Sequence, residues 1–165
     1  MKERAKNSTL ISQLEKLNIE VYNAITESCR LEDIRLIGLR YRVKPDYYSS
    51  IFSPEKKAVL RYEYKCDPKV SIIENEDKFD LVGIFDWNVR VLFKKKVFLS
   101  IVADYMILYS NSPSDNEVAA QFFVKRMGRN ATYPYLRALV NFLSAESQAN
   151  MPILPILTQP PVSPE

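Results

Sequence analysis

The stretch that decides the fold reads NATYPYLRALVNFLSAES over Asn130–Ser147. Proline is best tolerated in the first turn of a helix, where its missing N–H costs no hydrogen bond. Pro134 therefore predicts a helix start, with Thr132 as the candidate cap. Apolar residues then recur at helical spacing and predict one apolar stripe: Leu136, Leu139, Val140 and Leu143.

The chain continues as QANMPILPIL over Gln148–Leu157, which is apolar but not helical. Pro152 and Pro155 forbid a continued helix. We therefore expect an extended apolar segment, Met151–Leu157, that lies on the protein or binds something.

The composition predicts a folded protein. The chain has 165 residues, of which 47% are hydrophobic and only three are glycine, so we expect a single domain over residues 1–165. It has no apolar run of about 18 residues, so no membrane insertion is expected, and its basic start lacks the apolar stretch of a secretory signal. Cys29 and Cys66 fit no spacing motif, which favours reduced thiols and a cytoplasmic protein.

The sequence lacks residues that common kinds of catalysis and ligand binding require. Histidine is absent, which excludes Ser-His-Asp and Cys-His catalysis and removes the usual metal ligand. The three glycines are scattered and build no phosphate loop. Carboxylate pairs at Asp77/Asp80 and Glu74/Glu76 sit in a polar connector without a nucleophile. We therefore expect no enzymatic activity, no metal and no cofactor.

The charge gives little support to a nucleic-acid partner. The net charge is +3, and basic residues are mostly interleaved with acidic ones. The run Lys94–Lys96 is explained more commonly by a solvated hairpin tip than by nucleic-acid binding. The enriched class is aromatic, with ten Tyr, eight Phe and one Trp, side chains that serve cores and interfaces alike.

The periodicities predict a helix, four strands and two helices. Residues 9–29 show helical spacing, with Asn7 or Ser8 as a cap. Alternation then predicts four strands: Ile34–Val43, Val59–Cys66, Phe79–Phe93 and Val97–Tyr109. Asp67 and Pro68 are expected to end the second strand, and Val70–Lys78 to be a connector. The order is typical of an α+β fold with an antiparallel meander.

The fourth strand is apolar on both faces, so both faces need cover. Helices can cover one face. Either a second subunit or the N-terminal helix can cover the other, and the first alternative predicts a homo-oligomer. After this strand we expect a helix over Glu117–Met127, a break at Gly128–Asn130, and the second helix from Pro134.

At this point the chain resembles the SecB family of protein-export chaperones. Four features carry the resemblance, in this order: the strand VFLSIVADYMILYS (Val97–Ser110), the short helix VAAQFFVKRM, the helix start Tyr133-Pro134-Tyr135 with Arg137, and the apolar segment Met151–Leu157. It covers about Ile34 to Leu157, most of the chain.

The resemblance implies a four-stranded antiparallel sheet with C-terminal helices packed on one face, here with an extra N-terminal helical extension over residues 1–30. It implies a homotetramer that binds unfolded preproteins in apolar grooves for translocation and delivers them to the SecA motor. A related branch serves toxin–antitoxin modules by protecting an antitoxin. The chain lacks the family's last helix and acidic tail, ending in a Pro-rich tail (158–165) that we expect to be flexible, and its positive charge weakens the case for SecA but not for client holding.

The resemblance also places candidate client-binding residues. The loop between strands one and two is expected to wall the groove, strand two to form its floor, and the C-terminal segment its other wall. The candidates are Tyr47, Tyr48, Ile51, Phe52, Tyr62, Tyr64, Ile153, Leu154, Ile156 and Leu157. For each of them the alternative is ordinary packing. For Tyr62 and Tyr64, as for Trp87 and Phe93, core packing is the commoner role of a strand aromatic.

The sequence thus predicts an ATP-independent chaperone that holds non-native polypeptides. The alternative is a small α+β enzyme or ligand-binding domain that uses the concave side of the sheet as a pocket. Suppression of aggregation of unrelated clients would separate the two.

Overall fold

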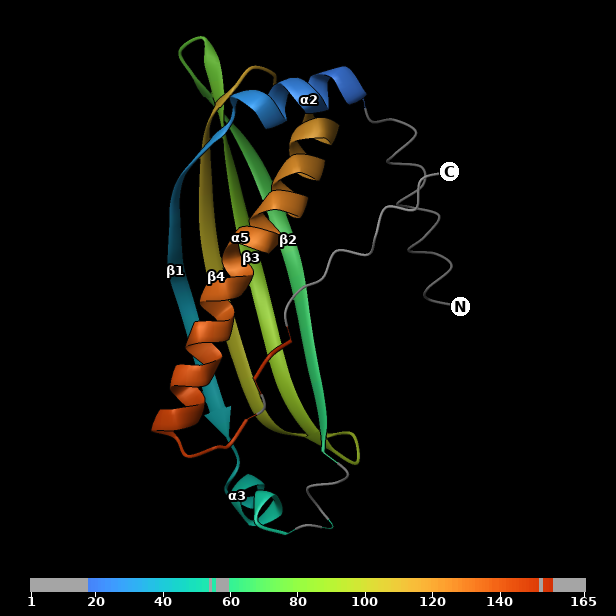
Figure 1. Ribbon diagram of the computed structural model, residues 1–165, viewed down its shortest axis with the longest axis vertical. Coiled ribbons are helices and arrows are strands. Elements are labelled where there is room, and N and C mark those ends of the chain that lie inside the picture. Colours follow the sequence, from blue (N-terminus) through green and yellow to red (C-terminus); the bar gives the residue numbers. More distant parts are fainter. Residues whose placement is uncertain (1–17, 54, 56–59, 152, 156–165) are drawn as a thin grey trace.

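A computed structural model describes residues 18–53, 55, 60–151 and 153–155. It has one antiparallel sheet with a long helix across one face and two short helices at its ends (Figure 1). The elements are α2 (Ile19–Ser28), β1 (Arg30–Val43), α3 (Pro45–Ile51), β2 (Arg61–Asn75), β3 (Lys78–Phe93), β4 (Lys96–Ser112) and α5 (Glu117–Glu146). The α+β class, the four strands and the presence of an N-terminal helix are confirmed, but helix α2 begins at Ile19 and not near residue 9.

The strand order β1-β4-β3-β2 corrects the predicted meander. Strands β2, β3 and β4 are joined by tight turns, whereas β1 lies on the far side of β4. The chain must therefore cross the end of the sheet between β1 and β2, and it does so through α3. Lys94 and Lys95 both have positive φ, 45° and 70°, as a two-residue hairpin turn requires, which confirms the predicted turn between β3 and β4.

Strand β2 is longer than predicted. Asp67 and Pro68 do not end it, and most of the expected connector Val70–Lys78 continues the strand as far as Asn75. Pro68 pairs with Phe85 within the ladder. This is possible because β2 is an edge strand, where N–H groups on the outer side have no ladder partner to lose.

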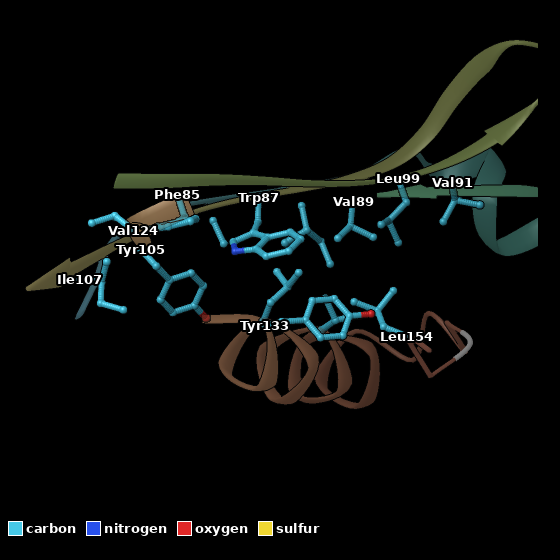
Figure 2. Close-up of a cluster of buried hydrophobic side chains, with 14 of the residues drawn as sticks. Phe85, Trp87, Val89, Val91, Leu99, Tyr105, Ile107, Val124, Tyr133 and Leu154 are labelled. Carbon is cyan, nitrogen blue, oxygen red and sulfur yellow. The ribbon is translucent and has the colours of Figure 1, made fainter. Parts of the chain in front are cut away.

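The core lies between the sheet and α5, where alternate residues of β3 and β4 point toward the helix (Figure 2). Trp87 is fully buried there, and its Nε1–H donates to Thr132 Oγ1 at 3.0 Å. The Thr132 hydroxyl in turn donates to the Gly128 carbonyl at 2.8 Å. The prediction that Thr132 caps a helix is therefore wrong. Thr132 is a buried hydrogen-bond partner of the only tryptophan.

The two predicted C-terminal helices are one continuous helix, α5, with Pro134 inside it. Gly128 does not break the helix, because it lets α5 approach Phe85 closely: a Cβ at this position would clash with the Phe85 ring. Pro134 removes only one helical hydrogen bond, to the carbonyl of Asn130, and both residues are exposed. Packing on the sheet outweighs these local signals, which is how most helices gain stability in proteins.

The fourth strand has the predicted two faces. Its inner face is buried from Leu99 to Tyr109. Its outer face is only half-buried, and no helix of the described residues covers it (Figure 1). The outer apolar residues are Phe98, Val102, Met106 and Leu108. The N-terminal helix α2 instead packs on α5 and the end of β4. It is capped by Asn18, and the expected caps Asn7 and Ser8 lie outside the described residues.

Candidate functional site

The predicted loop between the first two strands contains a short helix, α3, at one end of the sheet (Figure 1). Pro45 occupies its first turn, where a fixed φ and a missing N–H favour helix initiation. Residues four apart share a helix face, so Tyr47 and Ile51 both turn toward the core. Tyr47 is 0% exposed and Ile51 9%, whereas Phe52, which follows the helix, is 77% exposed.

The four candidates of this loop therefore differ in their environment. Tyr47 and Ile51 are core residues, Tyr48 is half-buried, and Phe52 is the loop aromatic that is largely exposed. Ordinary packing, the alternative for these residues, holds for Tyr47 and Ile51, because the seven-residue helix α3 turns one of its faces toward the core.

The tyrosines at this end of the molecule hold the chain where it leaves α5. We call residues 147–151 and 153–155 the post-helix segment. Tyr47 donates its hydroxyl to the Ala149 carbonyl at 2.7 Å, and Tyr48 donates to the Ser147 carbonyl at 2.9 Å. Tyr41 on β1 donates to Ser147 Oγ. Three tyrosines from β1 and α3 therefore fix the start of this segment.

A fourth tyrosine, Tyr133 on α5, holds the other end of the segment. Its hydroxyl donates to the Pro155 carbonyl at 2.6 Å. Leu154 is buried beside Tyr133 and points toward the sheet, whereas Ile153 is exposed (Figure 2). The predicted C-terminal apolar segment is thus packed as far as it is described. The candidates Ile156 and Leu157 lie outside the described residues.

Two further candidates, Tyr62 and Tyr64, lie on the α5 side of β2. They pair across the ladder with Val91 and Val89, whose side chains are buried under α5. Yet Tyr62 is 41% and Tyr64 37% exposed, because β2 is an edge strand that α5 covers incompletely. The Tyr64 ring lies 6.1 Å from that of Tyr133, which joins β2 to α5.

The structure brings two of the candidates, Tyr64 and Leu154, together around Tyr133, which sequence reasoning had not named as a site residue. Its ring also lies 5.4 Å from Trp87. The signal was present in the aromatic-Pro-aromatic motif, but the motif was read only as a helix start.

Sequence reasoning also missed a second exposed apolar surface, on β1. Leu31, Leu36 and Leu39 are each between two fifths and one half exposed. Their ladder partners are Tyr109, Tyr105 and Ala103, which are buried, so the three leucines face the same side as α5. They remain exposed because α5 packs chiefly on the other three strands. The alternation predicted the strand, but not that its inner face is left open.

The buried phenols stay neutral over a wide pH range. Desolvation by burial raises the pKa of Tyr47 and of Tyr133 above the ordinary 10.0, although Arg137 and Arg129 partly oppose this at Tyr133. Tyr47 and Tyr133 are therefore hydrogen-bond donors at neutral pH, as their bonds to backbone carbonyls require.

Within the ranges that the structure describes, no three acidic or cysteine side chains are arranged to hold a metal ion. Among the described helices, none is long and apolar enough to cross a membrane.

Comparisons with known proteins bear on the fold. No protein-family model matches the sequence, and no curated protein matches it significantly. Among solved structures, the chain is similar to the SecB-like chaperone Rv1957 of Mycobacterium tuberculosis, in complex with a ChAD peptide from the Rv1956 HigA1 antitoxin. The identity is 20%, the TM-score is 0.67, and the match covers 86% of this chain and 99% of that one.

A protein of unknown function from Streptococcus agalactiae matches with 10% identity and a TM-score of 0.43, over 79% of this chain and 97% of that one; at this score it carries no argument. The similarity to the mycobacterial chaperone spans nearly the whole of that protein and agrees with the four-stranded sheet, the long helix and the crossover described above. The chain therefore has the SecB-like fold.

Proposed function

We propose that this protein is a holding chaperone that binds non-native polypeptides through apolar side chains left exposed on the α5 side of its sheet. The observation that carries the proposal is that both edge strands keep such side chains in solvent, on a SecB-like fold. They are Leu31, Leu36 and Leu39 on β1, and Tyr62 and Tyr64 on β2. Apolar contact is tolerant of sequence and suits many clients.

The proposed activity is binding without catalysis, and it uses no nucleotide, metal or other cofactor. The clients are preproteins or an antitoxin, and the antitoxin peptide held by the mycobacterial structure supports the second. The proposed location is the cytoplasm. Delivery to SecA is a weaker part of the proposal, because the net charge is +3 where export members are acidic.

The proposal includes a homo-oligomer, with a tetramer as the expected state. The outer face of β4 carries the half-buried apolar side chains Phe98, Val102, Met106 and Leu108, which no helix of the described residues covers, and a strand that is apolar on both faces needs cover on both. Closed symmetry is the common solution for such a surface. The mass in light scattering at micromolar concentration measures this directly, and a monomer would contradict it.

The test of client binding is suppression of aggregation of several unrelated denatured proteins without ATP. The variant is Tyr62→Ser with Tyr64→Ser. The matched control is Glu63→Ser with Lys65→Ser, on the same strand but on the opposite face, since their ladder partners are Arg90 and Asn88. We expect the wild type and the control to suppress aggregation and the tyrosine variant to lose most of this effect. A wild type that protects no client would refute the proposal.

A further inference from the structure

The flank of α5 that borders β2 carries a row of alternating charge and aromatic side chain. Arg129, Tyr133 and Arg137 follow one another at intervals of four residues, which places them on one side of the helix. The Tyr133 ring lies 6.1 Å from Tyr64 on β2, so this side of the helix borders the exposed tyrosines of that strand. Both arginines act electrostatically on the Tyr133 phenol, and Arg129 also acts on Cys66 of β2.

The two arginines have no carboxylate partner in the part of the chain that the structure describes. The one ion pair found there joins Arg35 and Asp33 on β1. Arg129 is exposed, and the Nε–H of Arg137 is buried without a hydrogen-bond acceptor among the described residues. A buried donor that lacks an acceptor is unfavourable, and the bound state of a ligand can supply one.

The acidic residues of the neighbouring elements do not neutralise the row. On α5 the acids are Glu117 and Glu146, at the two ends of the helix. On β2, Glu63 and Asp67 alternate with Tyr64 and Cys66 and so point to the opposite face of the sheet. Burial is the main reason that the pKa of Cys66 is raised; Arg129 lowers this pKa, and Asp67 and Asp86 raise it, so charges of both signs act on this strand. Where α5 borders β2, the helix therefore contributes arginines and the strand contributes exposed tyrosine.

We propose that this row selects clients with acidic side chains: an extended polypeptide binds with one carboxylate at Arg129, one at Arg137, and an apolar side chain between them on the exposed ring of Tyr64, which packs against the buried Tyr133. This rests on the proposed function, whose client surface it specifies. Eight helical residues rise about 12 Å, and residues i, i+2 and i+4 of an extended chain share one face, with about 13 Å between the first and the last. The matching client pattern is acidic-x-apolar-x-acidic.

The occupant is a polypeptide because the surface is both apolar and charged. The exposed tyrosines offer contact to aliphatic or aromatic side chains, and a guanidinium pairs with a carboxylate through two parallel hydrogen bonds. Charge complementarity of this kind adds mostly specificity and rate of association. It would let the chaperone distinguish acidic apolar segments from the other non-native chains that it meets.

The experiment measures binding of fluorescein-labelled peptides to the full-length protein by fluorescence anisotropy. Three peptides share one sequence with a central leucine. They differ at two positions, two residues before and two residues after this leucine, where they carry Glu, Gln or Lys. We expect the Glu peptide to bind about tenfold more tightly than the Gln peptide at low salt, and the Lys peptide to bind most weakly. The advantage of Glu should shrink at about 0.5 M NaCl, where charges are screened within a few ångströms.

The variant Arg129→Gln with Arg137→Gln should lower the affinity for the Glu peptide to that for the Gln peptide, and leave the Gln peptide unaffected. The matched control is Lys65→Gln with Arg90→Gln, which removes the same charge from the opposite face of the sheet and should keep the preference. Arg129→Gln alone, at an exposed position, should remove part of the preference without affecting the melting temperature, so a folding defect of the double variant cannot hide the result.

Two outcomes would overturn the inference. One is equal binding of the Glu and Gln peptides by the wild type. The other is a change in the oligomeric mass of the arginine variants while they still prefer the Glu peptide. That result would mean that the row forms a contact between copies of the chain. In either case binding of the Gln peptide and suppression of aggregation would leave the proposed function standing. Failure of every peptide and client would remove both.

Discussion

Tyr47 and Phe52 lie five positions apart in one connection, yet the structure predicts opposite consequences when each is truncated. Tyr47 is 0% exposed, and its hydroxyl donates to the carbonyl of Ala149, a residue that is itself fully buried. Phe52 is 77% exposed. Tyr47→Phe, Tyr47→Ala and Phe52→Ala therefore separate three contributions: the hydroxyl, the buried ring and an exposed ring.

The expected magnitudes follow from burial. Tyr47→Phe leaves the Ala149 carbonyl without its donor, which should lower the free energy of unfolding by about 1–2 kcal/mol. Tyr47→Ala also removes a buried aromatic ring, and should lower it by about 3–5 kcal/mol. For a chain of this size each kcal/mol shifts the melting temperature by about 2–4 °C, which gives about 2–8 °C for Tyr47→Phe and 6–20 °C for Tyr47→Ala. Phe52→Ala should leave stability within about 0.5 kcal/mol.

The assay pairs thermal unfolding, followed by circular dichroism, with client affinity measured below the transition. Phe52→Ala is the variant of the three that should weaken client binding without lowering the melting temperature. If Phe52→Ala destabilised the protein as much as Tyr47→Ala, or if Tyr47→Phe changed nothing, the argument from burial would be refuted. Tyr48→Phe, which removes a hydroxyl from a half-buried ring, is the control and should have a smaller effect than Tyr47→Phe.

Two further predictions concern the core. Gly128→Ala should destabilise the protein by about 1–3 kcal/mol despite the better helix propensity of alanine, because the new Cβ would clash with Phe85. In urea unfolding, adding Phe85→Leu to this variant should restore part of the lost stability. A Gly128→Ala variant more stable than the wild type would contradict this contact. Stability should also fall at alkaline pH, because burial raises the pKa of Cys66 from 9.0 to about 12 and that of Tyr109 from 10.0 to about 12. At alkaline pH the folded state keeps these protons while the unfolded state loses them. The contribution of the two groups to stability is therefore complete below about pH 9 and is lost as the pH rises toward about 12. Urea titrations at pH 8 to 11 would show this decline, which Cys66→Ala should reduce in its lower part.

Strand existence was predictable from local pattern. Alternation located the four strands because each has an apolar face on the α5 side of the sheet, and the Lys94–Lys95 turn followed from its place between two long strands. The end of β2 was not predictable in this way. Asp67 and Pro68 are local stop signals, and they are tolerated only because this strand lies at the edge of the sheet. Strand order depends on long-range pairing, which no window of residues contains.

The candidate site shows the same division. The aromatic residues of the connection, of β2 and of the C-terminal segment were recognised from composition and from the resemblance, since large apolar side chains outside a regular pattern are visible in any sequence. Their exposure was not visible. Tyr47 and Phe52 have similar side chains in one short stretch, but the turn of α3 buries the first and leaves the second in solvent.

The single helix α5 is the clearest example of why local signals in the sequence do not fix where an element ends. Gly128 and Pro134 argue locally for two helices, and local propensities amount to about 1 kcal/mol for glycine and about 3 for proline. The packing of Gly128 on Phe85, the bond from Trp87 to Thr132 and the four tyrosines that hold the post-helix segment are contacts between residues distant in the chain. The chain's residue pattern determined which segments can be strands or helices. The tertiary structure decided where those segments end and which side chains reach solvent, because burial against the sheet exceeds the local preferences.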